Sequence, residues 1–84
     1  MISIEKNQRR IAVQGQEYEI IKNIYSEEYG HILKCCSLKL ENYREIYLLE
    51  SNEEGTYNVV NNEEMLEGII KEDKLPEEYE DIVL

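Results

Sequence analysis

Two adjacent cysteines and a single histidine are the residues of this 84-residue chain best suited to nucleophilic or metal chemistry. Neighbouring strand residues point to opposite faces and form a disulfide only in a strained geometry. We therefore expect Cys35 and Cys36 to be free thiols, one of them buried. Along an extended strand, His31 and Cys35 lie roughly 13 Å apart, too far to share a zinc ion or to act as a nucleophile–base pair. We predict no metal site and a surface position for His31 beside a turn.

Pairs of neighbouring glutamates are the remaining candidates for acid–base chemistry. They are Glu27-Glu28, Glu53-Glu54, Glu63-Glu64 and Glu77-Glu78. General acid–base catalysis needs one carboxyl desolvated while its partner stays ionised, whereas turns and first helical turns leave both hydrated. The glycines are isolated and form no phosphate-binding loop, and no segment has the ligand pattern of a calcium loop. The sequence therefore predicts a protein that is not an enzyme, with no catalytic residue and no cofactor.

The elements that position these residues begin with alternating strands. Residues 10–13 and 17–20 flank Gly15 and predict a hairpin, since glycine supplies the positive φ of a tight turn. A third strand is expected over 31–40, with Ile32, Lys34, Cys36, Leu38 and Leu40 facing inward because that set is the more apolar. Residues 45–50 and 56–60 predict a second hairpin around Gly55. Residues 1–9 are either a frayed start or an edge strand.

From Asn61 the apolar period changes from 2 to about 3.6, which predicts a helix. Asn61 is the expected N-cap, with Glu64 three residues later. The expected apolar stripe is Met65, Leu66, Ile69 and Ile70. We expect residues 73–76 to break this helix and Pro76 to open a short terminal turn. In that turn, the expected inward-facing residues are Tyr79, Ile82, Val83 and Leu84. The fold class is α+β: an antiparallel meander of four or five strands, with the C-terminal helix packed on one face and a short helical turn after it.

Length and composition predict a single domain over residues 1–84, with enough hydrophobic content for one small core. No apolar run approaches the roughly 18 residues that span a bilayer, and the first residues lack the apolar region of a signal peptide. A cytoplasmic protein without a membrane partner is expected. The net charge of −10 also disfavours direct binding to nucleic acid, which is itself negative.

The charge is divided unevenly along the chain. Residues 1–44 carry seven basic and six acidic side chains, whereas residues 45–84 carry two basic and thirteen acidic ones. Acids spaced along a helix can mimic nucleic-acid phosphates and occupy a basic groove. The expected protein-binding residues all lie in the C-terminal segment: Glu63, Glu64, Glu67, Glu72, Asp73, Glu77, Glu78, Tyr79, Glu80 and Asp81. The alternative is that these acids only solubilise a small core.

Residues 17–72 resemble the YrzB-like domains of unknown function from low-GC Gram-positive bacteria. The resemblance is carried by residues 17–21, a third strand, residues 45–50, an acidic turn and residues 61–66. It implies an order of strands followed by an acidic helix, and no activity. The adjacent cysteines and the segment after Pro76 depart from that pattern. In being small, acidic and rich in tyrosine, the chain is also similar to phage-encoded inhibitors of host defence nucleases.

Two functions follow as expectations. The first is an inhibitor of the anti-CRISPR type that docks its acidic half on the basic, nucleic-acid-binding surface of another protein. The second is a bacterial housekeeping or assembly domain that forms a homodimer through a strand edge or a sheet face.

Overall fold

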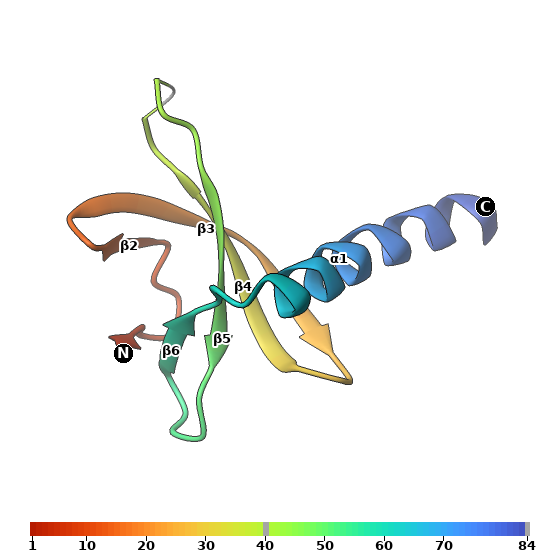
Figure 1. Ribbon diagram of the computed structural model, residues 1–84, viewed down its shortest axis with the longest axis horizontal. Coiled ribbons are helices and arrows are strands. Elements are labelled where there is room, and N and C mark those ends of the chain that lie inside the picture. Colours follow the sequence, from red (N-terminus) through yellow and green to blue (C-terminus); the bar gives the residue numbers. More distant parts are fainter. Residues whose placement is uncertain (40, 84) are drawn as a thin grey trace.

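The computed structural model describes the backbone of residues 1–39 and 41–83 and the side chains of residues 1–39 and 41–74. One antiparallel sheet curls almost into a barrel, and one helix lies across its outer face (Figure 1). The strands are β1 (Ile2–Ser3), β2 (Arg10–Val13), β3 (Gln16–Ser26), β4 (Gly30–Ser37), β5 (Glu45–Glu50) and β6 (Thr56–Val59), and the helix is α1 (Glu63–Val83). The described chain therefore agrees with the α+β class, but its sheet has six strands instead of four or five.

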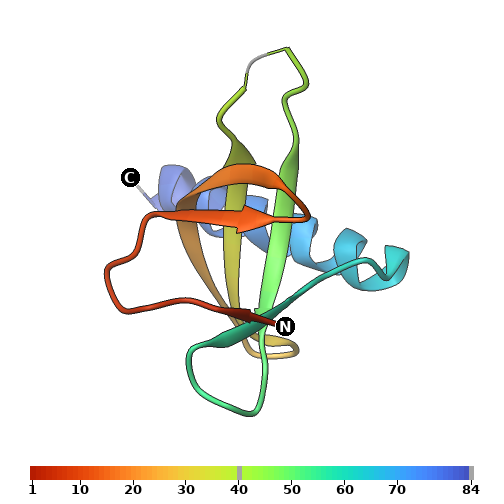
Figure 2. The ribbon, with the colours of Figure 1, turned by 90° about the vertical axis from the view of Figure 1, so that its left-hand side faces the viewer.

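The strand order is β1-β6-β5-β4-β3-β2, so strands β2 to β6 follow one another as sequence neighbours. Strand β1 instead pairs with β6 at the far end of the sheet, with Ile2 opposite Tyr57. The N-terminal segment is thus an edge strand, and the sheet departs from a simple meander. Figure 2 shows β1 and β2 together on the side of the sheet away from the helix.

The predicted hairpin at Gly15 is confirmed, with Val13 opposite Gln16 across a two-residue turn. Gln14 and Gly15 both have positive φ, 52° and 78°. This combination is typical of the tight turn that matches the twist of the flanking strands.

Both faces of the sheet are covered, which corrects the expected facing of the third strand. Leu33 and Cys35 lie in a core inside the curled sheet, together with Ile11, Val13, Tyr18, Leu48 and Tyr57. On the helix side, Ile32 packs with Ile24, Tyr47, Val60 and Ile69. The alternation was predicted, but the assumption of a single inward face was wrong, because the curl of the sheet buries the second face. Lys34 and Cys36 on the helix side are only half-buried.

The helix begins one residue later than expected. The Asn62 side chain accepts a hydrogen bond from the Met65 amide at 3.1 Å, so Asn62, not Asn61, is the N-cap. Ile70 is 39% exposed and lies outside the buried stripe. The helix also continues through Pro76 to Val83, so the predicted break and separate terminal turn are wrong. The described part of the chain contains no helix long and apolar enough to cross a membrane.

Candidate protein-binding helix

Helix α1 carries the acidic residues that the sequence singled out. Glu63, Glu64 and Glu67 are exposed in its first two turns. Glu63 and Glu64 lie in the first turn, where carboxylates interact favourably with the positive end of the helix dipole. Lys71 and Lys74 are exposed further along. Over residues 63–83 the sequence has nine acids and these two lysines, a net charge of −7. The sequence of the helix is therefore strongly acidic.

The helix is fixed to the sheet by an apolar contact at its centre. Ile69 is fully buried against residues of β3, β4 and β5, and Met65 and Leu66 pack at the border of the same cluster. Burial of an isoleucine side chain contributes about 1.5–3 kcal/mol. This contact holds the first half of α1 on the outer face of the sheet (Figure 1).

An ion-pair cluster lies one helical turn beyond Ile69. Asp73 is 7% exposed, and its carboxylate accepts hydrogen bonds from Lys22 of β3 and from Lys34 of β4, the latter at 2.9 Å. The Tyr47 hydroxyl donates to the same carboxylate at 3.4 Å. Burial raises the pKa of Asp73, but the hydrogen bonds and charges of the two lysines outweigh it, so the pKa lies below its usual value. The hydrogen bond that Lys34 donates to Asp73 in turn raises the pKa of Lys34.

Asp73 therefore differs from the other expected binding residues, because its charge is turned toward the sheet. Its neighbour Glu72 is half-buried and accepts a hydrogen bond from the Ser26 hydroxyl at 2.7 Å. Both acids attach the helix to β3 or β4. Among the described side chains, only Glu63, Glu64 and Glu67 of the expected set are left fully facing solvent.

A close contact between Tyr29 and the helix explains why residue 68, in the middle of the helix, is a glycine. A Cβ at Gly68 would lie 2.5 Å from the Tyr29 hydroxyl oxygen, closer than such atoms pack. Tyr29 belongs to the turn between β3 and β4 and packs against the apolar cluster under the helix. Gly68 thus lets this turn come against α1.

The last part of the helix extends past the sheet. In Figure 1, the backbone of α1 crosses the outer face and runs on beyond the strands toward the C-terminus. Glu77, Glu78, Tyr79, Glu80 and Asp81 belong to this stretch, and their side chains lie outside the described residues. The inward positions expected for Tyr79, Ile82, Val83 and Leu84 also lie outside them.

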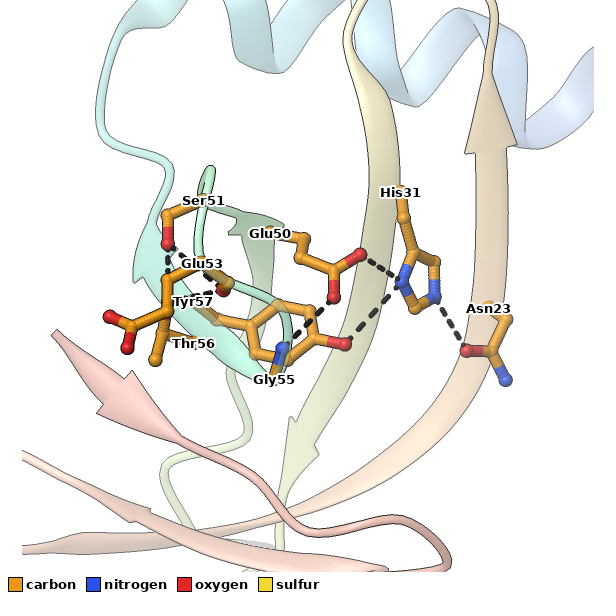
Figure 3. A network of polar contacts seen from close by, with 8 residues as sticks. All are labelled: Asn23, His31, Glu50, Ser51, Glu53, Gly55, Thr56 and Tyr57. Carbon is orange, nitrogen blue, oxygen red and sulfur yellow. Dashed lines mark hydrogen bonds and ion pairs between the residues drawn. The ribbon is translucent and has the colours of Figure 1, made fainter.

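A second polar cluster, which sequence reasoning missed, lies on the opposite side of the sheet (Figure 3). His31 Nδ1 is 3.1 Å from Glu50 Oε1 and 3.4 Å from the Tyr57 hydroxyl, and His31 Nε2 is 2.9 Å from Asn23 Oδ1. Tyr25 stacks on the imidazole with ring centroids 4.7 Å apart. The expected surface histidine is instead half-buried, with 21% of its side chain exposed.

This cluster joins four strands through one imidazole. Both ring nitrogens face oxygen atoms, and a protonated imidazole can donate to both of them. The Gly55 amide donates to the second oxygen of Glu50 at 3.2 Å. That bond, with the one from His31, holds the pKa of Glu50 below its usual value. The only sequence signal was the alternation of β3 and β4, which cannot show that residues 23, 31 and 50 meet.

The polar cluster borders an open cleft of about 740 Å³ at one end of the curled sheet. Ile20, Leu33 and Tyr57 supply apolar walls, and residues 4–8 form the opposite rim. In the described part of the chain, no three His, Cys, Asp or Glu side chains gather as metal ligands. Cys35 is fully buried and Cys36 half-buried, and both are free thiols, as predicted.

Comparison with known proteins finds no relative of this chain. No protein-family model, no curated protein and no solved structure matches it.

Proposed function

We propose that this protein is a non-enzymatic binding protein that docks α1 on a basic surface of another protein. In its most specific form, it is an inhibitor of the anti-CRISPR type that occupies the nucleic-acid channel of a defence nuclease. The observation that carries the proposal is the negative helix itself, anchored at Ile69 and Asp73 and extending beyond the sheet.

The acids of the helix fall into two groups, those that bond to the sheet and those that do not. Glu72 and Asp73 bond to the sheet and stabilise the position of α1. Glu63, Glu64 and Glu67 face solvent, and the sequence places four more acids at 77, 78, 80 and 81, within a turn and a half of helix. Carboxylates spaced along a helix can complement a channel built to hold phosphates, and charge complementarity mainly accelerates association.

The test is a titration of the full chain against a guide-loaded nuclease over about 50–500 mM salt, where screening changes strongly. We expect affinity to fall as salt rises. Reversal of Glu77, Glu78, Glu80 and Asp81 to lysine is expected to slow association about tenfold or more.

The matched control reverses four exposed acids outside the helix, namely Glu17, Glu41, Glu53 and Glu54. It changes net charge by the same amount, so a smaller effect assigns the binding to the helix. Absence of binding, or binding that ignores ionic strength, would rule out the proposal. Equal effects of the two variants would indicate that binding depends on the overall charge of the protein and not on docking of the helix.

A further inference from the structure

The cleft beside the His31 cluster is a preformed feature of the fold. Two residues of its lining, Leu33 and Tyr57, are buried members of the core inside the curled sheet. Its rim, residues 4–8, is held by the Gln8 side chain, which accepts a bond from the Glu5 amide at 3.0 Å and donates to the first carbonyl of β2 at 2.8 Å. No described residue of α1 lines the cleft. Its volume of about 740 Å³ lies within the range typical of ligand sites, which combine apolar walls with a few fixed polar groups.

The first fixed polar group of the cleft is the Glu50 carboxylate (Figure 3). One oxygen lies 3.1 Å from His31 Nδ1, and the other accepts a bond from the Gly55 amide at 3.2 Å. These bonds keep its pKa low, so the group is ionised at neutral pH. Each carboxylate oxygen has two lone pairs, so each can accept one further bond, and 24% of the side chain is exposed. Glu50 can therefore receive a donor that offers two N–H groups side by side.

The second group is the ring of Tyr25, which also lines the cleft. It stacks on His31 with ring centroids 4.7 Å apart and an angle of 7° between the planes. This contact covers one face of the phenol, yet the residue as a whole is 76% exposed, so the other face is open to a ligand. The face of an aromatic ring attracts cations, and flat ones also stack on it.

The charge of the lining favours the same class of ligand. Glu5, Glu50 and Glu54 contribute three carboxylates, against one lysine, Lys6. His31 adds at most one positive charge, so the lining is negative by one or two charges whichever form the imidazole takes. A cation is therefore attracted to this cleft and an anion is repelled.

We propose that the cleft binds a guanidinium group carried on a short apolar chain, as in an arginine side chain. Its planar fork matches the Glu50 carboxylate, and its flat face matches the open side of Tyr25. Ile4 and Ile20 in the lining accommodate the hydrocarbon part. A lysine-type ammonium is a compact and strongly hydrated charge that cannot stack, so it binds less well. This inference does not depend on what α1 binds.

The test is a titration of the full chain followed by the backbone amide signals in NMR spectra. The probe is N-acetyl-L-argininamide, and its matched control is N-acetyl-L-citrullinamide, which has nearly the same shape and no charge. We expect saturable shifts at His31 and Gly55 with a dissociation constant of about 1 mM or lower. The citrulline compound and the corresponding lysine compound are expected to bind about tenfold more weakly or less.

The guanidinium group could come from a free small molecule or from an arginine of a peptide. Agmatine, which lacks the peptide groups, distinguishes these sources. Tighter binding of agmatine than of the blocked arginine supports a small-molecule ligand, and the reverse order supports a peptide. Either order is consistent with a guanidinium site.

Two substitutions in the cleft complete the test. Tyr25→Leu and Glu50→Gln are each expected to weaken binding of the arginine compound about fivefold to tenfold. The matched controls, Tyr43→Leu and Glu41→Gln, change exposed residues outside the lining and leave binding unchanged. Circular dichroism shows whether each variant is folded, and exposed Tyr25 allows a change that spares the core.

Four outcomes would each overturn the proposal. They are no binding of the arginine compound up to about 10 mM, equal binding of the citrulline compound, full affinity in Tyr25→Leu, and shifts that are as large along α1 as around the cleft. The last result would mean that the probe only follows the acidic charge of the protein.

Discussion

Lys34 Nζ of β4 lies 2.9 Å from Asp73 Oδ2 of α1, and this pair joins the near-neutral half of the chain to its acidic half. Lys22 bonds to the same carboxylate from β3. The two lysines are thereby drawn to the helix side of the sheet. A buried acid between two lysines at once neutralises charge and sets where α1 crosses the strands.

Asp73→Asn is expected to lower the free energy of unfolding by about 1–3 kcal/mol, because it removes a buried charge partner from two lysines. We expect a loss of stability in the lower part of the usual range for buried ion pairs, because Lys22 and Lys34 keep 34% and 19% of their side chains exposed. Urea unfolding followed by circular dichroism measures the change. Glu67→Gln, an exposed acid on the same helix, is the control and is expected to change stability by less than about 0.5 kcal/mol. Equal effects would show that Asp73 does not anchor the helix.

The same carboxylate predicts how stability depends on pH. The pKa of Asp73 is lower in the folded protein than in the unfolded chain, so its contribution is present above about pH 4 and is lost as pH falls through the folded value. We expect the unfolding free energy to decline below about pH 4 more steeply in the native protein than in Asp73→Asn. Unfolding curves at stepwise acid pH give both slopes. Parallel slopes would contradict the assignment.

Cysteine reactivity is expected to differ sharply between the two neighbours. Burial raises the pKa of the Cys35 thiol to about 12, and its side chain is fully enclosed. Cys36 is half-buried on the other face. Since the thiolate is the reactive form, iodoacetamide at neutral pH should modify Cys36 and spare Cys35 until the protein unfolds. Mass spectrometry of native and urea-treated protein identifies the site. Early labelling of Cys35 would disprove its enclosure.

Gly68→Ala is expected not to give the gain that this substitution usually brings inside a helix. Alanine is favoured over glycine there by about 1 kcal/mol. The added methyl group would meet the Tyr29 hydroxyl at 2.5 Å, so tyrosine must move and the gain is lost. In a Tyr29→Ala background the same change should stabilise the protein by about 1 kcal/mol. A double-mutant cycle measured by urea unfolding compares the two. Identical effects in both backgrounds would mean that the contact is unimportant.

Local features of the fold follow directly from the residues. The turn at Gln14-Gly15, the alternation of β4 and the change of period before α1 were all predicted, because each depends on a few neighbouring residues. Apolarity favoured the side with Ile32, and Ile32 does pack with Ile69 of α1. The burial of Leu33 and Cys35 on the other face could not be predicted in this way, since it depends on the curl of the sheet around them.

Some features of the candidate site could also be predicted from the sequence, and others could not. The sequence by itself determined the negative charge of the C-terminal segment, since composition alone sets that charge. It could not distinguish exposed Glu67 from buried Asp73, because the lysines that enclose Asp73 lie 39 and 51 residues away in the chain. The His31 cluster likewise exists only once the strands are in register. Its chemistry depends on distances between separate strands, and only the tertiary structure decides those distances.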